Sequence, residues 1–250
     1  TLLAVGGVAA STIFTATAWN PLLIMALLVP VLGLFGYVFY DKLLQPLTKR
    51  SHFEYTVGSV LVTVGALLIL SDVAAWIAGP APRNIPLRFE AMEFGDVIVS
   101  TTQAWILGGI IVFTIVLHFY IKKSWFGRAM RAVTQDHTGA TICGVQADRV
   151  HALTFAFGSG IVAIAAVLYT MLFPVDPYMG FSLTVKAFTI IILGGIGNLV
   201  GALIAGIFLG LAEGFTSFFW ATQWAPAISI VLLLVILVIF PQGFGWRKSK

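Results

Sequence analysis

Two long apolar runs place the strongest constraint on the fold of this chain. Residues 97–121 and residues 151–175 contain no Asp, Glu, Lys or Arg. A transmembrane helix needs about 20 predominantly apolar residues to cross the hydrocarbon core of a bilayer. In lipid the backbone must satisfy its own hydrogen bonds, which a helix does. The two runs therefore predict membrane-spanning helices and an all-α polytopic membrane protein.

The composition of the whole chain supports this class and excludes others. The chain is 59% hydrophobic and only 10% charged, whereas soluble proteins carry roughly 25% charged residues. Its net charge of +4 comes from Lys and Arg clustered in short links, and a nucleic-acid-binding protein would spread them over a surface. Cys143 is the sole cysteine, so no internal disulfide can form. We expect a lipid bilayer, and no nucleic acid, as its surroundings.

The apolar runs divide the chain into a series of predicted spans. A turn at residues 18–20 ends the first run, and Pro241 with Gly243 ends the last. The first run is short and opens without a signal-peptide pattern, so we expect N-terminal spans, of roughly 40 to 50 residues, to be missing before it. We expect residues 1–250 to form a single transmembrane domain. The predicted simple spans are residues 2–17, 21–40, 55–78, 99–121, 151–173 and 225–240.

The links between these spans predict the orientation of the chain. Eleven of the 14 Lys and Arg residues fall in links 41–55 and 122–150 and in the C-terminal tail. Arg83 and Arg88 lie in the opposite link, together with three acidic residues. Because cytoplasmic loops are enriched in Lys and Arg, the first group of links is predicted to be cytoplasmic.

Residues 184–220 do not fit a single crossing. By the predicted orientation, this stretch must begin and end outside the cytoplasm. We therefore expect a re-entrant, broken helix pair near 183–198, in which a half-helix over 183–193 ends at the glycine-rich residues 194–198. Non-helical backbone at membrane depth is tolerated only where protein or a watery cavity covers it, and broken helices often line transport routes.

Glycines follow this break at helical spacing. Gly197 and Gly201 are four residues apart, as are Gly206, Gly210 and Gly214. Such spacing places small residues on one face and favours close helix packing. The alternative is that the break itself, with Gly194, Gly195, Gly197 and Gly201, forms part of a gate. A nucleotide site is not indicated, because no phosphate-binding loop pattern occurs.

Ionisable and catalytic side chains offer few functional signals. Lys186, Glu213 and Asp72 lie near the ends of apolar segments, which favours snorkelling or a structural ion pair over contact with a substrate. Lys186 and Phe188 remain candidates for the translocation path. The sequence Gly158-Ser159-Gly160 favours helix packing over a membrane serine protease, because no histidine lies mid-span to act as its base. One cysteine and scattered histidines predict no metal site.

The polar segment from Trp125 to Val150 is the most informative about function. Its residues 127–141 suit a short surface helix, on which Arg128 and Arg131 share one face. A small apolar counter-face is expected to consist of Ala129, Ala132, Val133 and Ala140. The segment is either a solvated linker that sets topology or a docking helix for a cytoplasmic motor.

Two runs of sequence resemble a known family. They are GRAMRAVTQDHTGATICGVQADRVHALTFAFGSG and PYMGFSLTVKAFTIIILGGIGNLVGALIAGIFLGLAEG. They resemble the LivH-type permease subunit of ABC importers for branched-chain amino acids, from about residue 127 to residue 245. One departure is the run Asn198-Leu199-Val200, where the family more often has a small residue followed by Ile-Pro.

The resemblance implies a set of partners and a set of site residues. The partners would be a second permease subunit of LivM type (or a second copy), two cytoplasmic ATPase subunits and an extracytoplasmic substrate-binding protein, in a prokaryotic plasma (inner) membrane. ATP and Mg would be held by the ATPase, and this chain would bind no cofactor and catalyse no reaction. A cytoplasmic coupling helix near 127–144 would dock on the ATPase through Gly127, Arg128, Arg131, Ala132, Asp136, Gly144 and Arg149.

Three other functions remain open from the sequence. Related permeases import urea, short amides or other amino acids. A stand-alone secondary carrier or channel would need ionisable groups in mid-membrane, which the spans lack. A structural membrane scaffold would show no substrate-dependent activity.

Overall fold

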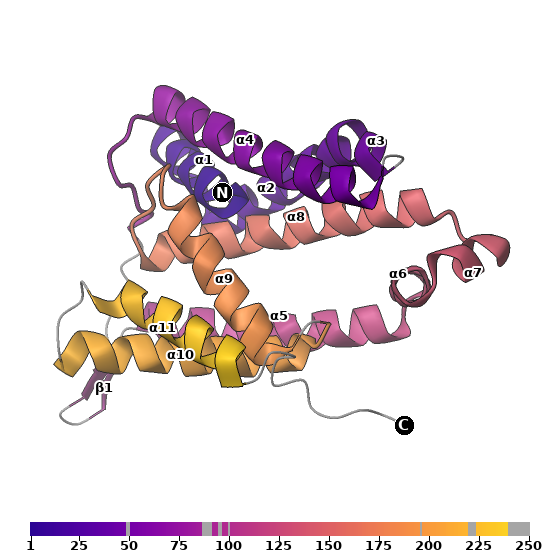
Figure 1. The fold of residues 1–250 in the computed structure, drawn as a ribbon. Coiled ribbons are helices and arrows are strands. Elements are labelled where there is room, and N and C mark those ends of the chain that lie inside the picture. The colour runs from indigo at the N-terminus through magenta and orange to yellow at the C-terminus, as the bar shows by residue number, and fades with distance from the viewer. Residues whose placement is uncertain are drawn as a thin grey trace. The chain divides into compact units, whose positions relative to one another are not determined.

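The computed structural model describes residues 1–48, 51–86, 92–94, 97–99, 101–195, 197–219 and 224–239. The chain forms two compact units, and Figure 1 shows the helices of both. Unit 1 comprises Thr1–Ile106 and Tyr120–Gly180, and unit 2 comprises Leu107–Phe119 and Phe181–Lys250. The prediction that residues 1–250 act as one domain stays a prediction.

Helices make up nearly all of the described structure. Unit 1 contains α1 (Leu2–Thr17), α2 (Pro21–Phe39), the π-helix η1 (Tyr40–Leu44), α3 (Gln45–Thr48), α4 (His52–Ala78), α6 (Trp125–Gln135), α7 (His137–Ile142) and α8 (Ala147–Leu172). Helix α5 (Thr101–Lys123) has its two ends in unit 1 and its middle in unit 2. The remaining helices are α9 (Gly180–Gly194), α10 (Leu199–Phe219) and α11 (Ala225–Ile239).

A short antiparallel hairpin departs from the predicted all-α class. Strand β1 (Met92–Phe94) pairs with β2 (Val97–Val99), with Glu93 opposite Ile98. The hairpin lies in the link that the sequence places between two spans, so the helical architecture is unaffected.

Five of the described helices are long and apolar enough to cross a membrane. They are Pro21–Thr48, Phe53–Ala78, Thr101–Lys123, Ala147–Leu172 and Leu199–Phe219. The first four confirm predicted spans to within a few residues at most ends. Helix α11 covers the predicted last span as far as Ile239, whereas Phe240 and the stop at Pro241 and Gly243 lie outside the described residues.

Local sequence explains where several of these helices begin. Asn20 caps α2 by accepting a hydrogen bond from the Leu22 amide at 3.1 Å, and Pro21 occupies the first helical position. Ser51 and Glu54 form a reciprocal capping box at the start of α4. Such caps satisfy amide groups that have no partner within the helix.

Small residues bring α1, α2 and α8 of unit 1 into close contact. A Cβ atom on Gly36 would lie 2.7 Å from the Cβ atom of Ser159, and one on Gly7 would lie 2.6 Å from the Thr170 hydroxyl. Ser159 itself is buried and donates to the Phe155 carbonyl at 2.9 Å. The packing role predicted for Ser159 is thus confirmed. The adjoining apolar core contains Ala10, Ile24, Leu28, Leu32, Ile85, Ala163 and Val167.

The link after α4 is fixed against the far end of α8. Arg83 and Val175 form an antiparallel bridge, with N–O distances of 2.9 and 2.7 Å. The Arg83 guanidinium also donates to the Ala78 carbonyl, and the fully buried Ile85 donates its amide to the Thr170 carbonyl at 3.1 Å.

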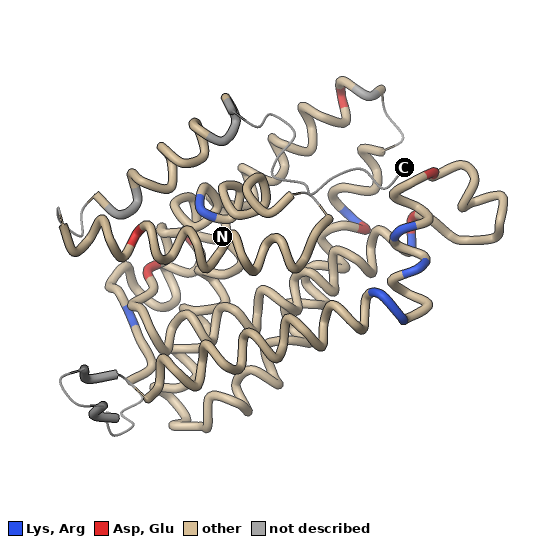
Figure 2. The backbone as a smooth tube through the Cα atoms, turned by 90° about the horizontal axis from the view of Figure 1, so that it is seen from below, with Lys and Arg blue, Asp and Glu red and all other residues tan. Residues whose placement is uncertain are grey.

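Basic residues of unit 1 gather at one end of the unit, around α6 and α7 (Figure 2). Helix α8 starts beside this end, because Ala147 and Val150 pack on α6 and α7. It finishes beside Arg83, the described basic residue that the sequence assigns to the opposite link. Lys49, Arg50, Arg88, Arg247, Lys248 and Lys250 lie outside the described residues. Which face of a membrane each end meets stays a prediction.

Candidate functional site

The polar segment between α5 and α8 folds as two helices, and the predicted continuous helix over residues 127–141 is wrong. Asp136 has extended backbone angles (φ −151°, ψ 104°) and separates α6 from α7. Its carboxylate accepts hydrogen bonds from the Thr138 and Gly139 amides at 2.9 and 3.0 Å. Aspartate caps a helix start well, so the chain ends α6 here and begins a new helix.

One face of this two-helix segment is apolar and buried. Ala129, Val133 and Ala140 pack against Ala147 and Val150 at the start of α8. Three of the four residues predicted for the counter-face are therefore buried. Ala132, the fourth, is exposed, and so are Asp136 and Arg149.

Arg128 and Arg131 share the exposed side of α6, but their guanidinium groups contact the protein itself. Arg131 donates to the Ile121 and Lys122 carbonyls at 2.8 and 3.2 Å. Arg128 donates to the Lys123 carbonyl at 2.9 Å. Sequence reasoning missed this role, because hydrogen bonds to backbone carbonyls five to ten residues away leave no signal in a charge pattern.

Two positions of the segment require glycine, each for a different structural reason. A Cβ atom on Gly127 would lie 1.8 Å from the Ile121 carbonyl oxygen, so the chain passes too closely for any side chain. Gly144 has φ +84° and ends α7. Its amide bonds the Thr141 carbonyl and the Val145 amide bonds the Ala140 carbonyl, both at 3.0 Å. This pattern is a Schellman motif, in which glycine supplies the left-handed residue.

The helix break predicted at residues 194–198 is present in unit 2. Helix α9 ends at Gly194 and α10 begins at Leu199, with Gly195 and Gly197 at φ +85° and +82°. A Cβ atom on Gly201 would lie 2.0 Å from the Gly194 carbonyl oxygen. The Asn198 side chain accepts a hydrogen bond from the Gly201 amide at 3.0 Å and so caps α10. Ile196 lies outside the described residues.

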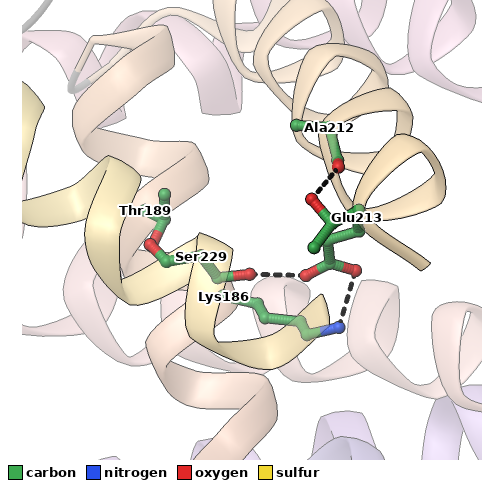
Figure 3. Close-up of polar contacts among 6 residues, drawn as sticks. Lys186, Thr189, Ala212, Glu213 and Ser229 are labelled. Carbon is green, nitrogen blue, oxygen red and sulfur yellow. Dashed lines mark hydrogen bonds and ion pairs between the residues drawn. The ribbon is translucent and has the colours of Figure 1, made fainter. Parts of the chain in front are cut away.

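A polar cluster joins α9, α10 and α11 (Figure 3). Lys186 on α9 and Glu213 on α10 form an ion pair at 2.8 Å. Ser229 on α11 donates its hydroxyl to the second carboxylate oxygen of Glu213. Thr189 on α9 donates to the Ser229 carbonyl at 3.1 Å, which closes a ring of contacts. The structural ion pair that the sequence allowed for Lys186 and Glu213 is therefore present.

The other residues predicted for the path or for packing are not brought together. Phe188 is exposed on α9. A Cβ atom on Gly206, Gly210 or Gly214 would have no neighbour within 4 Å among the described residues. These three glycines thus face open space in the described structure, and helix packing on this face stays a prediction.

Unit 1 also contains a cavity of about 440 Å³ that the sequence did not predict. Tyr40, His151, Phe155 and Ser159 contribute to its lining. The His151 ring stacks on Tyr40 and on His137 of α7, with centroid distances of 6.2 and 6.1 Å. Over the described part of the chain, no three His, Cys, Asp or Glu side chains are grouped to hold a metal ion.

Comparison with known families matches nearly the whole chain. The family described as branched-chain amino acid transport system / permease component matches residues 1–240. No solved structure gives a significant match.

Several curated relatives are described as permease proteins of branched-chain amino acid transport systems. The LivH permease protein of the high-affinity branched-chain amino acid transport system of Escherichia coli is 39% identical over 76% of this chain. The BraD permease protein of Pseudomonas aeruginosa is 30% identical over 67% of the chain. A probable LivH protein of Methanocaldococcus jannaschii is 23% identical over 98% of it. The matches span 64% of LivH, 56% of BraD and 82% of the M. jannaschii protein.

Proposed function

This chain belongs to the family of permease components of branched-chain amino acid transport systems, and on that basis we propose that it is the membrane-spanning subunit of an ATP-driven importer. Its substrates are branched-chain amino acids delivered by an extracytoplasmic binding protein. The match over residues 1–240, together with 39% identity to LivH, carries the proposal.

The assembly requires further chains in the prokaryotic plasma membrane. We propose a LivM-type permease or a second copy as the membrane partner, and two cytoplasmic ATPase subunits that hold ATP and Mg. The basic end of unit 1 faces the cytoplasm in this proposal. The support is the positive-inside rule together with Arg83 at the opposite end of α8.

Residues 127–144 are proposed as the segment that docks on the ATPase. Support comes from their place between two apolar helices, α5 and α8, and from their division into a buried and an exposed face. Exposed positions include Ala132, Asp136 and Gly144, whereas Gly127 is buried at the bend. Closure of the ATPase would move this segment and so rock the helices attached to it.

The re-entrant pair around 183–198 is proposed to line the route through the membrane. The break between Gly194 and Leu199 supports this, because such breaks persist only where protein or a cavity covers them. The ring of Lys186, Thr189, Glu213 and Ser229 holds the three helices near the break together. Phe188 and Gly201 lie on the same helices, so movement of the ring would move them.

Reconstitution of the complex into liposomes tests the function. We expect a second permease and two ATPase subunits to co-purify with the chain, and loaded binding protein to stimulate both ATP hydrolysis and leucine uptake. A lone homo-oligomer that transports without ATP would instead indicate a carrier or channel. A complex with no substrate-dependent activity would indicate a scaffold. Uptake of urea or acetamide, with no uptake of leucine, would reassign the substrate.

A further inference from the structure

The last turn of α5 has an unusual set of partners. A helix ends with four carbonyl groups that have no partner within the helix. In α5 these belong to Tyr120, Ile121, Lys122 and Lys123. The Ser124 amide bonds the first at 2.9 Å. The other three accept hydrogen bonds from the arginines of α6, at 2.8, 3.2 and 2.9 Å.

These bonds join two separate helices at a bend. We call this bend the α5–α6 elbow and define it as the carbonyls of residues 121–123 together with Gly127, Arg128 and Arg131. Positive side chains are favoured at helix C-termini because they meet the negative end of the helix dipole. Here the positive groups belong to the next helix. They therefore fix the direction of α6 as well as capping α5.

Chain geometry tightens the elbow further. Gly127 lies so close to the Ile121 carbonyl that even a methyl group would clash with backbone atoms. The Ser124 hydroxyl accepts a hydrogen bond from the Gly127 amide at 3.0 Å and holds the first turn of α6. The bend is thus held from both sides, by a close backbone approach and by guanidinium groups.

The far side of α6 is fastened to a different helix. Ala129 and Val133 are buried against the start of α8. Helix α6 therefore connects two helices, through hydrogen bonds to the end of α5 and through apolar packing against the start of α8.

We propose that Arg131 and Arg128 are positioning residues that lock α6 to α5, so that a push on α6 moves α5 and α8 together. This inference rests on the proposed function, because it assigns the arginines a role in coupling. In this proposal the two arginines bind the end of α5, and the ATPase contacts other positions within residues 127–144.

Arginine suits this task better than lysine. Its planar guanidinium group presents several donors in a fixed geometry, whereas an ammonium group is a single point charge on a flexible stem. Arg131 uses two different nitrogens on two successive carbonyls. A lysine there would retain the charge and lose the second, orienting contact.

The first arm of the test measures the elbow itself. Spin labels are attached at Lys122→Cys and Gln135→Cys, both exposed positions, after Cys143 is replaced by Ser. The parent should give one narrow distance distribution. We expect Arg131→Gln to broaden it clearly and Arg131→Lys to broaden it less. An unchanged distribution in Arg131→Gln would overturn the proposal.

The second arm measures coupling in the assembled, reconstituted complex. We expect Arg131→Gln to keep its ATPase subunits on purification. The amount of ATP hydrolysed per leucine imported should rise several-fold, up to about tenfold, because each exposed contact with a helix C-terminus changes an equilibrium constant about two- to fivefold. Arg131→Lys should recover part of the loss. The matched control is Lys122→Gln, which removes a neighbouring exposed charge and leaves its carbonyl in place.

The outcomes separate this inference from the proposed function. Loss of the ATPase from Arg131→Gln, with a narrow distance distribution, would show that the arginine contacts the ATPase directly and would overturn the proposal. A parent chain that never binds an ATPase would refute the proposed function, while the first arm would still decide whether the elbow is locked.

Discussion

Single residues between 127 and 144 act mainly through the backbone. Arg131 binds carbonyls, Asp136 binds amides and Gly144 adopts a left-handed conformation. A family motif indicates that such residues matter, and the structure supplies physical reasons. For Gly144 the reason is the conformation itself, because a Cβ atom there would meet nothing within 4 Å among the described residues.

Replacement of Gly144 by alanine should loosen α7. A left-handed residue with a Cβ atom costs about 1–2 kcal/mol, so we expect amide hydrogen exchange in residues 140–145 to quicken about tenfold. Asparagine, which tolerates this conformation better, should have a smaller effect. Gly65→Ala, at a helical position in α4 with open space around it, is the control and should change nothing or slow exchange locally. Unchanged protection in Gly144→Ala would contradict the assignment.

At the scale of elements, the ring of Lys186, Thr189, Glu213 and Ser229 ties α9, α10 and α11. The ion-paired side chains are 28% and 19% exposed, so the pair is largely shielded. Breaking a shielded pair on one side leaves an uncompensated charge, whereas replacing both partners with apolar residues is often nearly neutral.

Lys186→Met should therefore destabilise the chain by about 2 kcal/mol, below the range for a fully buried pair because of partial exposure. Adding Glu213→Met should recover most of that loss. Lys42→Met removes one partner of an exposed pair (Lys42–Asp41, 3.1 Å) and should cost close to nothing, which makes it the control. Thermal unfolding in detergent compares the parent chain, the Lys186→Met and Lys42→Met variants and the double variant. A double variant as unstable as Lys186→Met alone would refute the pairwise account.

Sequence patterns predict elements well where the chain is apolar, and poorly where polar side chains choose among local partners. The spans followed from runs such as residues 151–173, since a bilayer needs about 20 apolar residues whatever the tertiary contacts. The break at Gly194 followed from glycine content. Asp136 was missed, because aspartate in a polar stretch can lie within a helix or start a new one. The contacts of Arg131 and of Lys186 join residues ten and 27 positions apart, and nothing local encodes them.

At the scale of the whole molecule, the orientation in the membrane is the prediction with the widest consequences. It decides whether the basic end of unit 1 meets an ATPase. The chain contains a natural probe, because Cys143 is the sole cysteine and is exposed beside α7.

A membrane-impermeant maleimide should label Cys143 in inverted vesicles and leave it unlabelled in intact cells. The matched protein carries Cys143→Ser with Ala81→Cys, an exposed position in the link after α4, and should show the opposite pattern. Labelling of Cys143 from outside intact cells would reverse the orientation and remove the basis for an ATPase-docking segment.

The π-helix at Tyr40–Leu44 has a consequence for variation in chain length. Its widened turn bonds the Gln45 amide to the Tyr40 carbonyl, five residues back, and so holds one more residue than an α-helical turn. Deleting one residue there would restore ordinary helical bonding, and the helical parts before and after would keep nearly the same relative orientation, because the wide turn absorbs the extra residue. Tyr40 and Leu44 are both buried in the cluster with Ala152, so the change in packing would be local to this turn. The loss of one residue is thus better tolerated at this turn than within α2, where it would rotate the following residues by about 100°.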